Sequence, residues 1–191
     1  MEHGEKMVKE HFSSLYDFLV YSSFLNRTYY LEDEIGETIS GDLSRMIDLW
    51  KSYPEKKATI YLCSPGGDVF AGIALYDAIL TSGFPINCIV QGYAASMASI
   101  ILQAGARRLI TRNSKIMIHE VSRLTTWLKH EETSKLLEEA AELKKVNDWC
   151  IDVLATRSKH SAEEILNVVK KTDKWFTAQE ALEFGLVDEI I

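Results

Sequence analysis

The chain has 191 residues, a length that fits one domain, and we expect a single domain over residues 1–191. Its net charge of −7 leaves no basic stripe for nucleic acid. No apolar run reaches the roughly 18–20 residues that cross a bilayer, and the charged start lacks the apolar centre of a signal peptide. Three scattered cysteines without a CxxC pair indicate a reducing compartment. These features predict a cytoplasmic protein that binds neither nucleic acid nor membrane.

The first quarter of the chain leads from a polar segment into a helix. Residues 1–14 are polar, and we expect them to form a flexible leader. Residues 15–31 are rich in aromatic side chains and end in the strand-like run 28–31. Residues 40–50 carry apolar side chains at three-and-four spacing, which predicts a helix.

The middle of the chain alternates β-rich runs with helical ones. Short β-rich runs cover 58–63, 86–90 and 115–119. Between them, an apolar stripe predicts a helix over 69–80, and a segment that is apolar nearly all round predicts a buried helix over 96–104. This alternation predicts parallel βαβ units with right-handed crossovers, and therefore an α/β fold.

The last third is helical. A helix over about 125–156 has one apolar face, and a helix this long in a compact domain often projects and packs against another subunit. Capping boxes at Ser161 and Thr177, each with Glu three residues on, predict two short helices. Residues 186–191 read as a closing strand.

One serine opens a buried helix directly after a strand. Ser96 follows the small residues GYAA, so its hydroxyl lies at the positive end of that helix, beside free backbone N–H groups. Such a position suits a nucleophile whose intermediate is an oxyanion. Taken alone, the same pattern is more often a helix N-cap in a closely packed turn.

A glycine-rich turn, SPGGD over residues 64–68, joins the preceding strand to its helix. Glycine lets backbone N–H groups approach a ligand without an intervening Cβ. The amides of Gly67 and Met97 could then converge on a carbonyl oxygen, as acyl transfer requires. An ordinary tight turn remains the alternative.

A histidine ends the third β-rich run. His119 would lie at the carboxyl edge of the sheet, where catalytic residues of parallel sheets gather. The other four histidines lie in the leader, among helix charges or in a turn. A structural role for His119 in the core remains open.

The acid that would orient this histidine is harder to select. Asp173 lies in a short connection between two capped helices, where neighbouring aromatic residues could shield it. A plain turn residue is an equally good interpretation. Asp188 could simply end a strand, while Asp148 and Asp152 face outward from the long helix.

Four blocks of sequence carry a family resemblance. In chain order they are SPGGDVFAGIALYDAI, GYAASMASIILQAG, IMIHE and DKWFTAQEALEFGLVDEI. From about Tyr21 to Ile191 the chain resembles the Clp protease proteolytic subunit family in block order and spacing. The resemblance implies a ClpP/crotonase-like α/β fold, a ββα superhelix with a long projecting handle helix. SPGGDVFAG is also similar to Clp-like peptidases associated with phage head maturation.

The resemblance also implies a function, that of a serine endopeptidase acting on unfolded polypeptides through an acyl-enzyme. Ser96 would be the nucleophile, His119 the general base and Asp173 the third member of the triad. Gly67 and Met97 would supply the oxyanion-hole amides.

The substrate is expected to lie extended along a strand edge near residues 120–126, with Val121, Ser122 and Arg123 as binding residues. The resemblance implies a homo-oligomer, either a heptameric ring or a tetradecamer of two rings. No metal or cofactor is required. Because the chain has no GxxxxGK[ST] motif, any ATP would be hydrolysed by a separate AAA+ unfoldase partner.

Three departures from the family pattern leave parts of this interpretation open. The glycines that usually follow the base are missing from 120–126, so the substrate groove differs. Lys171-Thr172 replaces the usual acid–arginine pair, which leaves the number of rings open. The N-terminal stretch does not match the family's axial loop, which leaves the ATPase partner open. A crotonase-type acyl-CoA enzyme and a non-catalytic ring subunit are the alternative functions.

Overall fold

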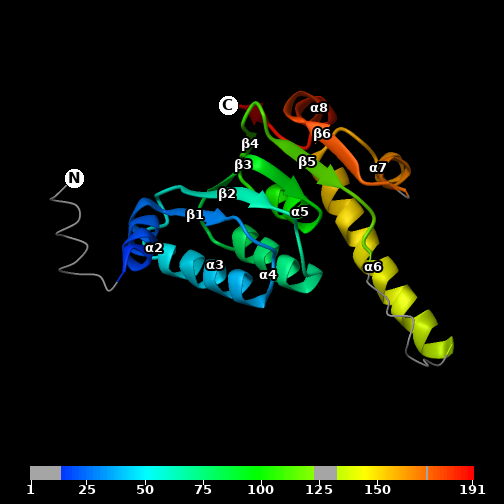
Figure 1. Ribbon diagram of the computed structural model, residues 1–191, viewed down its shortest axis with the longest axis horizontal. Helices are drawn as coiled ribbons and strands as arrows, with labels where there is room; N and C mark the ends of the chain where they lie inside the picture. The colour runs from blue at the N-terminus through cyan, green and yellow to red at the C-terminus, as the bar shows by residue number, and fades with distance from the viewer. Residues whose placement is uncertain (1–13, 123–132, 171) are drawn as a thin grey trace.

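The computed structural model describes residues 14–122, 133–170 and 172–191 (Figure 1). These residues form one mixed sheet covered by helices. The strands are β1 (Thr28–Leu31), β2 (Ala58–Ser64), β3 (Ile86–Ala95), β4 (Arg108–Ile110), β5 (Lys115–Ile118), β6 (Lys174–Thr177) and β7 (Glu189–Ile190). The helices are α2 (Leu15–Asn26), α3 (Glu37–Trp50), α4 (Val69–Leu80), α5 (Met97–Gln103), α6 (Thr133–Arg157), α7 (Ala162–Val169) and α8 (Ala178–Phe184).

The sheet is parallel except at one edge. Strands β1, β2, β3, β4 and β7 lie side by side in that order, and every pair among them is parallel. The long strand β3 pairs with β4 through residues 88–90 and with β5 through residues 93–95. Strand β6 adds to β5 in antiparallel orientation. The predicted α/β fold with parallel βαβ units is confirmed.

The helices pack around a continuous apolar core. Contacts run from α3 to α4, from α4 to α5, and from α5 to α6. Every residue of α5 is buried, as its apolar sequence predicts, because it lies between the sheet and two other helices. Helix α6 extends away from the sheet (Figure 1).

Several elements differ from the sequence predictions. Residues 15–26 form a helix, which the aromatic composition did not indicate. The three-residue strand β4 was not predicted. The short connection expected at 172–175 leads instead into strand β6, residues 174–177, in which only Phe176 is buried, so no alternating pattern marks it.

Two predicted segments lie partly outside the described residues. The long helix was expected from about 125, and the structure gives α6 from Thr133 to Arg157, while residues 123–132 lie outside the described residues. Most of the expected leader, residues 1–13, also lies outside them, and Ser14 is the N-cap of α2.

Candidate active site

The backbone at Ser96 has an unusual conformation. Ser96 joins β3 to α5 with φ 53° and ψ −124°, and only one other described non-glycine residue, Arg27, has a positive φ. Ser96 stands at the N-cap position, yet its side chain makes no capping hydrogen bond. The turn therefore directs the hydroxyl away from α5, and the interpretation of Ser96 as a simple cap does not hold.

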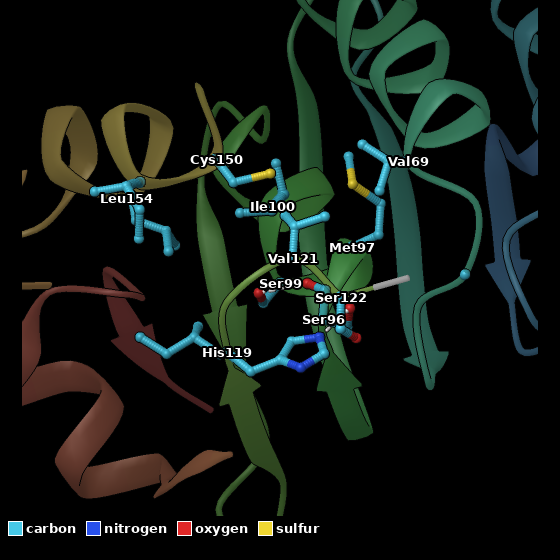
Figure 2. Close-up of a pocket in the computed structure, with 13 residues that line it drawn as sticks. Val69, Ser96, Met97, Ser99, Ile100, His119, Val121, Ser122, Cys150 and Leu154 are labelled. Carbon is cyan, nitrogen blue, oxygen red and sulfur yellow. Dashed lines mark hydrogen bonds between the residues drawn. The ribbon is translucent and has the colours of Figure 1, made fainter. Parts of the chain in front are cut away.

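The hydroxyl of Ser96 faces an imidazole. Pairing of β3 with β5 places Ala95 opposite Met117, and the Ser96 N–H donates to the Met117 carbonyl at 2.9 Å. His119, just past the end of β5, then lies beside Ser96, with its Nε2 2.7 Å from the Ser96 Oγ. Figure 2 shows the ring pointing toward Ser96 across the end of the sheet. This is the distance expected between a nucleophile and its general base.

A carboxylate faces the other ring nitrogen. Asp173 directly precedes β6, whose pairing places Lys174 opposite Ile118, next to His119. The Asp173 Oδ1 lies 3.4 Å from the His119 Nδ1, longer than a good hydrogen bond. The Asp173 side chain is 64% exposed, so water competes for it. The structure thus brings together all three predicted triad residues, with the serine–histidine contact the tighter one.

The glycine turn after β2 lies against the start of α5. A Cβ on Gly66 would stand 2.7 Å from the Ala95 carbonyl oxygen and 2.8 Å from the Met97 nitrogen. The Gly66 φ of 93° also requires glycine. Gly67 and Met97 both line the cavity beside Ser96. As the first residue of α5, Met97 has an N–H without an intrahelical acceptor, so it is available to an oxyanion.

Beside the serine lies a cavity of about 220 Å³, the inner cavity (Figure 2). Its apolar lining residues are Val69, Met97, Ile100, Ile118, Val121, Cys150, Ile151 and Leu154. Burial raises the pKa of the Cys150 thiol to about 12, so this thiol stays neutral near pH 7 and does not compete with the serine as nucleophile.

The predicted substrate-binding residues are described in part. Val121 and Ser122 line the inner cavity, whereas Arg123 lies outside the described residues. The Val121 N–H donates to the Asn147 Oδ1 at 2.9 Å, which ties this segment to α6. Sequence reasoning missed Asn147, because a single polar residue on a long helix carries no signal of its partner.

Helix α6 contributes to this site, which the sequence did not predict. Cys150, Ile151 and Leu154 project from it into the inner cavity. The apolar spacing of these residues predicts that this face of the helix is buried, but it does not show which part of the protein it packs against. Ser99 was also missed, and its Oγ donates to the Ser96 carbonyl at 2.6 Å.

Within residues 14–122, 133–170 and 172–191, no group of three or more His, Cys, Asp or Glu side chains is placed to hold a metal ion. None of the described helices is both long and apolar enough to cross a membrane.

A serine hydroxyl bonded to an imidazole, with a carboxylate behind the ring and a cavity beside it, is the arrangement of a serine hydrolase. Residues 10–191 match the Clp protease family, and the chain belongs to that family. It is a serine-type endopeptidase.

Named relatives agree with this assignment. The chain is 29% identical to the ATP-dependent Clp protease proteolytic subunit 3 of Rhodococcus jostii, over 92% of this chain and 86% of that protein. It is 32% identical to the corresponding subunit of Deinococcus radiodurans, over 78% and 72% of the two chains. It is 33% identical to that of Porphyromonas gingivalis, over 87% and 74%.

Proposed function

We propose that this protein cleaves unfolded polypeptides through an acyl-enzyme formed on Ser96. The observation that carries the proposal is the 2.7 Å contact between the His119 Nε2 and the Ser96 Oγ. A crotonase-type acyl-CoA enzyme does not need this pair, so the contact favours the peptidase.

In the first half-reaction, His119 takes the hydroxyl proton as the Ser96 oxygen attacks the scissile carbonyl carbon. The amides of Gly67 and Met97 stabilise the negative charge on the carbonyl oxygen. His119 then gives its proton to the leaving amine as the C–N bond breaks. In the second half-reaction, His119 takes a proton from water, whose oxygen attacks the ester, and returns it to Ser96. Asp173 keeps the Nδ1 proton in place throughout.

The oxyanion amides are expected to contribute a large share of the rate. Removing one such donor costs about 2.7–4 kcal/mol of barrier in well-studied hydrolases. Gly67 supports this role because its φ of 148° and its close approach to Ile35 exclude a side chain there. The turn can therefore bring a backbone N–H, unshielded, up to the reacting carbonyl.

The substrate is proposed to lie extended along the segment after His119, with Val121, Ser122 and Arg123 as binding residues. An apolar side chain next to the scissile bond would enter the inner cavity, whose lining includes eight apolar side chains. No metal or cofactor takes part in the proposed steps.

We propose that the chain forms one domain and assembles into a homo-oligomeric ring, heptameric or tetradecameric, in the cytoplasm. A single core cluster joins buried residues from β1 to α8, which supports one domain. The apolar side chains exposed on α2 support assembly. By analogy with relatives named as ATP-dependent, a separate AAA+ ATPase would deliver unfolded substrate.

The decisive experiment is labelling with a fluorophosphonate, which reacts with an activated serine. Wild type is expected to be labelled, Ser96→Ala to be unlabelled, and His119→Ala to react at least about 100-fold more slowly, as expected for loss of a general base. Ser52→Ala, which removes an exposed serine remote from the site, serves as the matched control. Retained labelling in Ser96→Ala would remove Ser96 from its role, and an unlabelled wild type would favour a non-catalytic ring subunit.

A further inference from the structure

A second cavity adjoins the inner one. This outer groove has a volume of about 580 Å³ and lies between the start of α4 and the first half of α6. Val69, Val121 and Ser122 line both the inner cavity and the outer groove, so the two adjoin. A polypeptide bound at the inner cavity therefore lies next to the outer groove.

One face of α6 lines both hollows. The groove residues on α6 recur at intervals of three and four, the spacing of a single helix face: Lys135, Glu138, Glu139, Glu142, Leu143 and Val146. The same face continues as Cys150, Ile151 and Leu154 in the inner cavity. From Cys150, Glu142 is about 12 Å away along the helix and Glu138 about 18 Å. Because an extended peptide rises about 3.3 Å per residue, these spans correspond to about three to five residues.

The two ends of this face differ in chemistry. Polar and apolar surface contribute about equally to the inner cavity, whereas the outer groove has a mainly apolar surface and carries four carboxylates and one ammonium, a net charge of minus three. Asp68 already accepts a hydrogen bond from the Ala71 N–H as the cap of α4. Glu142 has an exposed ion pair with Lys145, which water and a competing cation can exchange. The glutamates therefore make the groove attractive to cations and repellent to anions.

An aromatic ring completes the groove. The Phe70 side chain is 72% exposed at the groove wall, although its neighbours on α4, Ala71 and Gly72, are buried. An aromatic face among carboxylates favours a Lys or Arg side chain, whose aliphatic stem packs on the ring and whose charge interacts with both. Leu143 and Val146 offer further apolar surface to such a stem.

We propose that the outer groove is a substrate subsite that selects a Lys or Arg side chain about three to five residues from the scissile bond. The occupant is the polypeptide substrate itself, because the groove adjoins the inner cavity, which Ser96 and His119 line. The inference rests on the proposed function, and it adds to it a preference for basic segments that carry an apolar residue at the cleavage point.

The test is a positional scan with fluorogenic peptides. Each peptide keeps one apolar residue at the cleavage point and carries Lys, Glu or norleucine at one position, up to six residues away on either side. We expect kcat/KM to be about threefold to tenfold higher for Lys than for Glu at three to five residues on one side, the size of a few exposed ion pairs. Raising the salt concentration from 0.05 to 0.5 M should reduce this ratio toward one.

Variants assign the preference to the groove. The double variant Glu138→Gln with Glu142→Gln should lower the Lys-to-Glu ratio of kcat/KM at least about threefold. Phe70→Ala should lower the ratio of kcat/KM for the Lys peptide to that for the norleucine peptide. Asp152→Asn, which removes an exposed acid of the same helix outside the groove, should leave both ratios unchanged.

Two failures can be told apart by fluorophosphonate labelling of the same samples. Labelled enzyme that cleaves Lys and Glu peptides equally at every position overturns the subsite and leaves the peptidase intact. If fluorophosphonate does not label the wild type, the proposed function itself is overturned. If the double glutamine variant changes the native mass but not the Lys-to-Glu ratio, the groove holds a second copy of the chain and the subsite proposal fails.

Discussion

At Ser96, the backbone adopts a conformation that favours glycine. With φ 53° and ψ −124°, a residue with a Cβ is strained, and strain of this kind typically costs about 1–3 kcal/mol. The surroundings hold it in place, since the Ser96 N–H donates to Met117 and its carbonyl accepts from the N–H and hydroxyl of Ser99. The strain turns the hydroxyl toward His119 instead of toward the helix.

Replacing Ser96 by glycine should therefore stabilise the protein relative to alanine. Both variants lack the hydroxyl and its bond to His119, so their comparison isolates the backbone. We expect Ser96→Gly to unfold with a free energy about 1 kcal/mol higher than Ser96→Ala, measured by urea denaturation at pH 7. Equal stabilities would mean that the turn is not strained.

At the scale of elements, two contacts shape the site around His119: one places its acid, and the other holds the segment that follows it. The antiparallel pairing of β5 with β6 brings Asp173 to the imidazole. The hydrogen bond from the Val121 N–H to Asn147 holds the segment of Val121 and Ser122, which lines both the inner cavity and the outer groove, against α6. The long helix thus contributes to the geometry of the site as well as to its lining.

Asn147→Ala should loosen that wall. Without its acceptor, the Val121 N–H is left to water, which should cost about 1 kcal/mol of stability and raise the KM for peptides several-fold. The rate of fluorophosphonate labelling should change less, because Ser96 and His119 are held by β3 and β5. Asn147→Asp keeps an oxygen acceptor and should retain most of the affinity. An unchanged KM in Asn147→Ala would show that the contact does not position the segment.

The sequence predicts the central elements well, because local pattern and final packing agree there. The helix over 69–80 is observed at those bounds, and the β-rich run at 58–63 corresponds to β2. Strand β4 has only three residues, and β6 has a single buried residue among exposed ones, so neither shows a period-two pattern. These residues form strands because they pair with neighbouring strands that are distant in the sequence.

The candidate site shows the same division between local and distant information. Ser96 and Gly67 are marked by their turns, and His119 by the end of a strand. Asp173 is singled out only by family resemblance, because it is an exposed residue 54 positions beyond the histidine and its neighbour is set by the register of β6. The outer groove follows from how α6 meets α4, which no local pattern encodes.

At the scale of the whole molecule, a buried arginine ties the C-terminal strand to the sheet. The Arg108 guanidinium is buried, and it donates to the Asp188 carboxylate, to Gln103 and to the carbonyls of Arg157 and Gly185. Burial alone would raise the pKa of Asp188. The hydrogen bonds and charge of Arg108 outweigh it and lower this pKa.

This lowered pKa predicts a pH dependence. An ionised Asp188 stabilises the fold above its unfolded-state pKa of about 3.9, and that contribution is lost as pH falls through the lower folded-state pKa. Asp188→Asn should lower the free energy of unfolding by about 1–3 kcal/mol at pH 7, because Arg108 loses its charged partner. The gap between wild type and variant should shrink toward pH 3. A gap that does not change between pH 7 and pH 3 would contradict this prediction.

Assembly is predicted to depend on α2. None of its residues is buried, although most are apolar, and the Leu19 side chain is 52% exposed. An exposed apolar face of this kind marks an interaction surface. We expect Leu19→Lys to reduce the native mass toward that of a monomer, with Glu163→Lys, at an exposed position of α7, as the control. Equal masses for Leu19→Lys and wild type would exclude α2 from the interface.

The order of the site residues along the chain has a consequence for synthesis. The ribosome completes Ser96 and His119 well before Asp173, and the imidazole meets its acid only after residues 174–177 have paired with 115–118. A nascent chain that stops before this point carries a nucleophile and a base without the carboxylate that orients them. Activity that depends on this carboxylate is therefore expected only after residues 174–177 have been synthesised and have paired with β5.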